Sequence, residues 1–231
     1  MLRLAGFFVL VLLALAVLRE LPLVGRVFRV PLLGFWLTAI LVSVAASKLA
    51  ADALDRRRQR ALARSLGSVE TPRNQGKLGA LLLAQGHARR AVPPLERAVA
   101  GEPDSVEWHY RLGLARLSTG DAAGATSALA RAVEMNEEHA YGAARLRLAE
   151  ARAKAGDPEG ALEDLRRFEA SHGPNPESAY RRGAVLRRLG RRDEARGAFD
   201  EVRRLGRDLA GYQRSGATGW ILRASLARWV G

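Results

Sequence analysis

The sequence predicts an all-α protein: an N-terminal transmembrane helical hairpin, followed by an α-solenoid of four helix-turn-helix repeats with a C-terminal capping helix. Three observations predict this fold class. Two long stretches without charge lie in the first 47 of the 231 residues. Glycine, alanine and leucine then recur in one register with a period of about 34 residues. Helix-forming composition continues after the last repeat, where an array of repeats needs a cover for its exposed apolar side.

Of the two apolar segments, the second has the length expected of a membrane helix, and the first is short for one. Leu4–Leu18 contains fifteen residues and Val30–Ser47 eighteen, none of them charged. At about 1.5 Å per residue, the second segment reaches roughly 27 Å, against a hydrocarbon core of about 30 Å. The shorter first segment is interpreted as a spanning helix extended by Arg3, as a cleaved signal peptide, or as a helix in the membrane interface. The predicted membrane domain is 1–47, with helices at about 4–18 and 31–47.

Basic residues gather after the second apolar segment. Because positive charge stays on the cytoplasmic side, the repeats are expected in the cytoplasm. Pro31 suits a helix start and Gly67 a helix end, so the second segment is expected to continue as a basic helical stalk over 48–70. The bases either attract anionic lipid or serve as a topology signal on a solvated helix. The membrane-surface candidates are Lys48, Arg56, Arg57, Arg58 and Arg60.

Four repeats share one register over residues 71–205. Each has a turn glycine, which takes the left-handed conformation that ends the first helix. Alanine follows five residues later, and Leu or Phe four further on. Small residues are expected where two helices cross closely, and large ones between repeats. The positions are Gly86, Gly120, Gly156 and Gly190; Ala91, Ala125, Ala161 and Ala195; Leu95, Leu129, Leu165 and Phe199. The repeats span about 72–105, 106–141, 142–175 and 176–205.

This register resembles that of the tetratricopeptide-repeat family over residues 72–205. The resemblance implies a superhelix that binds other proteins through a concave face built from the first helices. In the first repeat this face offers Gly76, Ala80 and Leu83, which lack the Lys and Asn of chaperone-binding members. The partner-binding residues carried over from the family are Tyr110, Leu114 and Leu117; Leu146, Glu150 and Lys154; and Tyr180, Ala184, Arg187 and Arg188.

Two departures from the family pattern are visible. Pro93-Pro94 should distort the first turn of a second helix, and Arg182 stands where Leu is usual.

The implied groove runs from apolar to basic, which suits a ligand with an aromatic or aliphatic anchor and acidic residues at one end. An anchor followed by cytoplasmic repeats resembles bacterial envelope-biogenesis scaffolds. That architecture implies a protein of the bacterial inner membrane, with membrane lipids and unidentified proteins as partners.

The net charge of +13 is concentrated towards the C-terminus, where residues 179–231 carry thirteen Arg and five acidic residues. An alternative function is therefore binding to an anionic lipid surface through this quarter. Nucleic acid is not expected as a partner, because aromatic residues do not interleave with the arginines.

Residues 206–231 are predicted to form capping helices, over Asp208–Arg214 and Trp220–Val230, separated by Gly216 and Gly219. Leu222 and Leu226 share one helical face with Trp229 and Val230. That face either covers the last repeat or contacts a membrane surface or a partner.

No residues suggest an enzyme. The chain has no cysteine, and its histidines do not converge in the predicted register. No serine has a histidine at plausible motif spacing, and no phosphate loop occurs. Carboxylates are expected on the outer, solvated faces of the helices. We therefore expect no catalytic residue, metal, cofactor or small-molecule substrate, and interpret the chain as a membrane-anchored adaptor. The histidines are His87, His109, His139 and His172.

Overall fold

The computed structural model describes residues 31–68, 70–209 and 211–229. Within these ranges every regular element is an α-helix. The chain divides into two units, residues 1–62 and 63–231, and each is described by itself. The first apolar segment, Leu4–Leu18, lies outside the described residues.

Helix α3 (Pro31–Gly67) provides the described residues of the first unit and begins and ends at the expected proline and glycine. Its side chains Ile40, Leu41 and Val44 are 57, 61 and 62% exposed. Among the described residues, no helix combines the length and the hydropathy needed to cross a membrane. The expected span over 31–47 therefore gains no support from the described helix.

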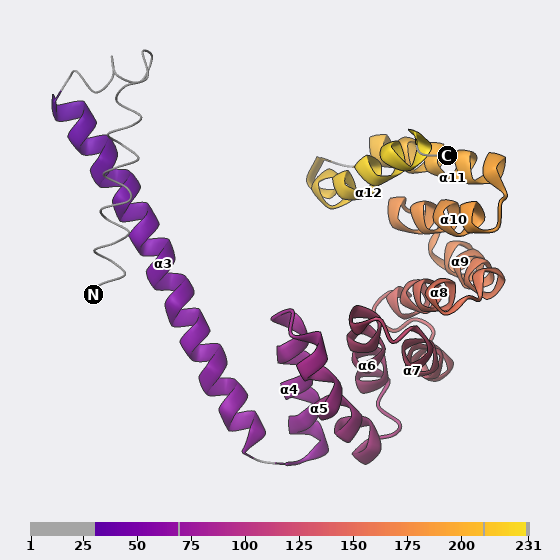
Figure 1. Cartoon of the computed structure of the whole chain (residues 1–231), viewed down its shortest axis with the longest axis horizontal. Helices are drawn as coiled ribbons and strands as arrows, with labels where there is room; N and C mark the ends of the chain where they lie inside the picture. Colours follow the sequence, from indigo (N-terminus) through magenta and orange to yellow (C-terminus); the bar gives the residue numbers. More distant parts are fainter. Residues whose placement is uncertain (1–30, 69, 210, 230–231) are drawn as a thin grey trace. The chain divides into compact units, whose positions relative to one another are not determined.

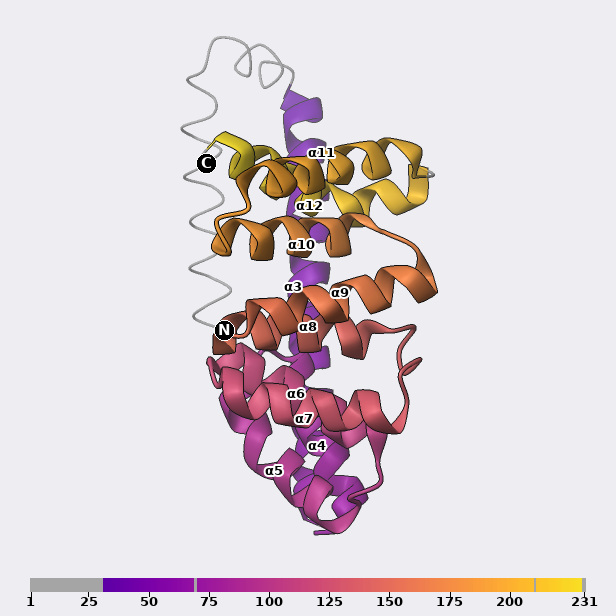
Figure 2. The same ribbon diagram turned by 90° about the vertical axis from the view of Figure 1, so that its right-hand side faces the viewer.

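In the second unit, four pairs of antiparallel helices follow one another in an arc (Figure 1). The first helices of the pairs lie on the inner side of the arc, and the second helices form the outer side that Figure 2 presents. The pairs are α4 (Pro72–Ala84) with α5 (Ala88–Gly101), α6 (Val106–Thr119) with α7 (Ala122–Met135), α8 (Ala143–Ala155) with α9 (Pro158–His172), and α10 (Pro176–Arg188) with α11 (Arg192–Asp208).

Close crossings within the pairs explain the small residues of the register. A Cβ atom on Gly113 would lie 2.4 Å from Cγ of Leu129, so only glycine lets α6 approach α7 this closely. Ala125 and Ala161 are fully buried at the equivalent crossings. The turn glycines end the first helices with φ between 75° and 92°. Asp121 then caps α7, because its Oδ1 accepts a 2.9 Å hydrogen bond from the Gly124 amide.

Both departures from the repeat pattern are accommodated. Helix α5 continues through Pro93 and Pro94, so the expected distortion does not break it. Arg182, in place of an apolar residue, forms ion pairs with Glu169 of α9 and Glu201 of α11. A charged side chain therefore occupies this seam between repeats, because two carboxylates face it.

One carboxylate is buried, contrary to the expectation that acidic side chains stay on solvated faces. Asp164 of α9 is 3% exposed and lies 3.2 Å from the guanidinium of Arg145 and 3.0 Å from that of Arg152. Burial raises the pKa of Asp164, although the two arginines act in the opposite direction. This pairing ties α8 to α9 in the third repeat.

The C-terminal region forms one helix, α12 (Gly211–Trp229), and not two segments separated by Gly216 and Gly219. Both glycines lie within the helix. It packs against α10 and α11 through Ala217 and Ala224, which are 4% and 1% exposed. The face that contains Leu222 and Leu226 does not cover the last repeat: these side chains are 61% and 59% exposed.

Candidate protein-binding groove

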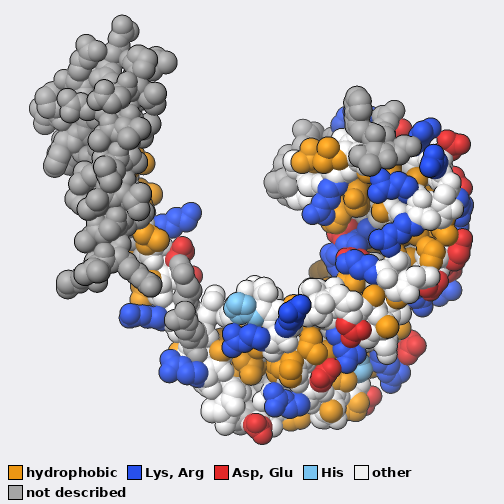
Figure 3. Space-filling view, viewed as in Figure 1, with side chains coloured by type: hydrophobic (Ala, Val, Ile, Leu, Met, Phe, Trp, Pro, Cys, Tyr) orange, Lys and Arg blue, Asp and Glu red, His pale blue; other side chains and the backbone are white. Residues whose placement is uncertain are grey.

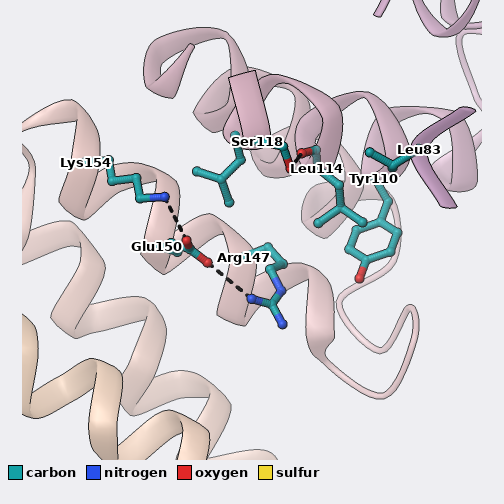
Figure 4. A pocket seen from close by; sticks show the side chains of 8 residues that line it. Leu83, Tyr110, Leu114, Ser118, Arg147, Glu150 and Lys154 are labelled. Atoms are coloured by element: carbon teal, nitrogen blue, oxygen red, sulfur yellow. Dashed lines mark hydrogen bonds and ion pairs between the residues drawn. The ribbon is translucent and has the colours of Figure 1, made fainter. Parts of the chain in front are cut away.

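A hollow of about 430 Å³ opens where α4, α6 and α8 meet, with mainly apolar side chains on α4 and α6 and charged ones on α8. Figure 4 shows Leu114 beside Tyr110, with Leu83 on the neighbouring helix. Burial raises the pKa of the Tyr110 phenol further above neutrality, and its protonated hydroxyl is able to donate a hydrogen bond. The lining residues are Leu83, Tyr110, Leu114, Leu117, Ser118, Arg147, Glu150 and Lys154.

A second, smaller hollow of about 110 Å³ lies between α8 and α10. Glu150 and Lys154 line both hollows, which therefore adjoin along α8. Together they are called the groove below. The second hollow is lined by Ala149, Glu150, Ala153, Lys154, Leu165, Tyr180, Arg181, Ala184, Val185 and Arg188.

Glu150 is the centre of a charge network between the hollows. Its carboxylate lies 2.7 Å from Arg181, 2.9 Å from Lys154 and 3.2 Å from Arg147. Burial opposes its ionisation, but the charges and hydrogen bonds of Arg181 and Lys154 outweigh that effect and lower the pKa of Glu150 to about 2. The carboxylate is therefore ionised at any physiological pH and holds the three cations in place.

A second carboxylate joins the same network. Glu177 of α10 lies 2.9 Å from Arg147 and 2.8 Å from Arg181, so both arginines bridge two repeats. The remaining cation, Arg188, donates a 2.6 Å hydrogen bond to the Ala153 carbonyl. Two carboxylates thus face four cations, leaving this part of the groove positive. Figure 3 shows Lys and Arg side chains gathered on the inner side of the arc towards its C-terminal end.

The structure brings together most of the partner-binding candidates. Leu146 does not reach the groove, because it is 6% exposed within the core formed by α8 to α12. Arg187 lines neither hollow; it lies over the Phe199 ring at 5.9 Å and donates to the Ala227 carbonyl. Those that line the groove are Tyr110, Leu114, Leu117, Glu150, Lys154, Tyr180, Ala184 and Arg188.

Sequence reasoning missed Arg147, which together with Arg181 supplies half of the groove's positive charge. The signal was present in the repeat register. Arg111, Arg147 and Arg181 each stand two residues before the small residue of a first helix. They therefore recur at the same height on successive first helices, where they meet carboxylates of the same or the neighbouring repeat.

Some aromatic side chains of the first helices pack inside the fold, and others line the groove. Trp108 packs on Gly76, where a Cβ atom would lie 2.5 Å from the indole ring, and its indole N–H donates to Glu102 at 2.7 Å. Gly76 is thus buried beneath Trp108 and unavailable to a ligand. Tyr180 contacts the rings of Phe199 and Trp220 and also lines the second hollow.

The arginines of the C-terminal quarter are largely engaged within the fold. Ion pairs to nearby carboxylates hold Arg191 and Arg204 in addition to Arg181 and Arg182. On α3, Lys48, Arg57 and Arg58 are exposed. Arg56 and Arg60 lie on the same helix, but their side chains are outside the described ones.

Family models match the repeats. A tetratricopeptide repeat model matches residues 77–143, and a tetratricopeptide repeat-like domain model matches residues 111–210. The chain therefore contains tetratricopeptide repeats, and the predicted solenoid of such repeats is confirmed.

Solved structures of the protein MamA have a similar fold. The structure named MamA MSR-1 C2 is 19% identical, with a TM-score of 0.60 over 72% of this chain and 98% of that one. A crystal structure of MamA protein is 22% identical, with a TM-score of 0.59 over 74% and 96%. Another MamA crystal structure is 24% identical, with a TM-score of 0.55 over 62% and 84%. At these identities the likeness concerns the fold alone. No curated protein matches the chain.

Proposed function

We propose that this tetratricopeptide-repeat chain is a scaffold that binds a segment of a partner protein in the groove. One observation carries the proposal: Tyr110 and Leu114 line a hollow that adjoins a second one, which Arg181 and Arg188 line together with apolar side chains. Apolar anchors in such hollows usually provide most of the binding energy, while charges steer association.

The chemistry of the groove defines the partner segment. An aromatic or aliphatic side chain fits the hollow of about 430 Å³ beside Tyr110. Acidic side chains a few residues away would then face Lys154, Arg181 and Arg188. The Glu150 carboxylate is ionised at neutral pH, because its pKa is about 2. The scaffold needs no catalytic step, and we assign none.

The proposal includes attachment to a membrane through the N-terminal region, with the repeats in the cytoplasm of a bacterium. The two charge-free segments and the basic residues that follow them support it. A reporter fused after Gly231 should be active only on the cytoplasmic side, and activity outside would refute this topology. N-terminal sequencing of the purified protein would show whether Leu4–Leu18 is retained.

Site-specific photo-cross-linking in intact membranes tests the groove. A photoreactive residue at Leu114 should give discrete cross-linked products that mass spectrometry identifies. Ala123, exposed on the second helix α7, is the matched control and should give few. Equal products from both positions would argue against the groove as the binding site.

Variants of groove residues distinguish the apolar contribution to affinity from the effect of charge on the association rate. Tyr110→Ala should weaken capture of the cross-linked partner at all salt concentrations, because it removes an anchor. Arg188→Glu should slow association mainly at low salt. Arg187→Glu has the same change of charge outside both hollows and should have a smaller effect.

Binding to anionic lipid is the competing function. Under it, reversing Arg187 and Arg188 together would detach the repeats from anionic vesicles and leave protein capture intact. The ion pairs that engage Arg181, Arg182 and Arg191 leave less charge for lipid than the sequence suggests. Detachment from vesicles without loss of protein capture would replace the scaffold proposal with a lipid-surface function.

A further inference from the structure

Helix α12 follows the register of the first helices of the repeats. Gly219 stands 36 residues after Gly183, the same interval that separates Gly113 from Ala149. The next residue, Trp220, contacts Tyr180 at a ring-centroid distance of 5.4 Å on the first helix α10. Ile221 then packs on α11, where a Cβ atom at Gly206 would lie 2.4 Å from it. By these contacts, α12 occupies the place of a fifth first helix.

The described residues place no second helix over α12. In the repeats, the small residue of the first helix lies beneath Leu or Phe of the second: a Cβ at Gly79 would be 2.4 Å from Leu95, and one at Gly183 2.6 Å from Phe199. At Gly219 nothing lies within 4 Å.

The leucines beside this glycine are equally uncovered. Leu222 stands three residues after Gly219, as Leu82 follows Gly79 and Leu186 follows Gly183. Leu82 and Leu186 are 8% and 5% exposed, whereas Leu222 is 61% exposed. Leu226, one turn further along α12, is 59% exposed. Gly219, Leu222 and Leu226 are called the open face below.

Positive charge lies on α12 and between α11 and α12. A hollow of about 450 Å³ between α11 and α12 is lined by Asp200, Arg203, Gly206, Arg207 and Ile221. Arg223 lies over the Trp220 ring on α12 itself, 4.9 Å from its centroid. Three arginines therefore accompany one aspartate around the hollow and α12.

We propose that the open face binds an amphipathic helix of a partner protein in the manner of a second helix of a repeat. The covered repeats define the chemistry of that helix: a small residue with Leu or Phe four positions later, as in Ala161 and Leu165. The arginines require acidic residues on its flank. A second copy of this chain fits less well, because α12 pairing with itself would bring Arg203, Arg207 and Arg223 near their own counterparts. This surface is separate from the groove, so the two proposals fail independently.

A peptide of this chain's own residues 158–172 is a suitable probe. It carries Ala161, Leu165 and Phe168 on one face, together with four acidic residues. Binding of the labelled peptide to the full chain in nanodiscs of neutral lipid is measured by fluorescence anisotropy. We expect the double variant Leu222→Ser, Leu226→Ser to lower the affinity at least tenfold. Both leucines are exposed, so the melting temperature should stay unchanged.

Matched controls assign the binding to the open face. Leu114→Ser in the groove should leave the affinity within twofold, and the peptide variant Leu165→Ser should not bind. Arg203→Glu should weaken binding several-fold at low salt. The proposal is overturned if the peptide does not bind, or if it binds the double variant as tightly as the original chain. It is likewise overturned if Leu114→Ser abolishes binding, or if the chain sediments as a dimer that the double variant dissociates.

Discussion

Replacing Glu150 by glutamine removes the carboxylate that Arg147, Lys154 and Arg181 share in the groove. The pKa of this group is lowered from 4.5 to about 2 in the folded chain. The difference corresponds to at most about 3.4 kcal/mol of stability at neutral pH. Its side chain is 21% exposed and that of Lys154 is 45% exposed, so solvent screening reduces the effect. We expect Glu150→Gln to lower the free energy of unfolding by about 1–2 kcal/mol at pH 7.

The pH dependence is a sharper test than the size of the loss. Because the folded pKa lies below the unfolded one, this stabilisation is fully present above pH 4.5 and is lost as pH falls towards 2. Once Glu150 is protonated, it is neutral like the glutamine that replaces it, so the two proteins should converge in stability. Guanidinium unfolding of residues 63–231 should show a difference at pH 3 of about half that at pH 7.

A matched control is Glu163→Gln, which removes a carboxylate that is 47% exposed from its pairs with Arg166 and Arg167. It should change the free energy of unfolding by less than about 0.5 kcal/mol. A difference between Glu150→Gln and the original chain that is the same at pH 3 and pH 7 would refute the reasoning.

Three further predictions concern the repeat register, measured by guanidinium unfolding of residues 63–231. Ala161→Leu should destabilise by about 1–3 kcal/mol because the site is fully buried, whereas exposed Ala123→Leu should change little. Gly113→Ala should destabilise the fold, because the added Cβ would contact Leu129. Gly197→Ala has open space around it and should stabilise the fold by about 0.5–1 kcal/mol. A change in the free energy of unfolding with the same sign for both variants would contradict the packing. Asp157→Ala should lower stability by about 1 kcal/mol, because Asp157 accepts the Gly160 amide at the start of α9.

The sequence alone was sufficient for the helices of the repeats and their pairing. Helix bounds followed from local signals, such as Gly120 at the end of α6. Pairing followed from the register, because a glycine or alanine recurs wherever two backbones cross, as at Gly113. This small residue recurs in all four repeats. Its physical cause, the close crossing of two helices, lies within a single repeat.

Features that depend on two repeats were decided only by the tertiary structure. Arg147 and Arg181 lie in the groove because carboxylates of neighbouring repeats face them. On α12 the apolar pattern did not reveal the buried side: Ala217 and Ala224 face the core, and Leu222 faces outwards.

Burial of a charged group was likewise decided by a facing helix. Asp164 is buried because Arg145 and Arg152 of α8 neutralise it. Which face of a helix is covered depends on the helix that packs beside it, and a helix's own sequence does not contain that neighbour.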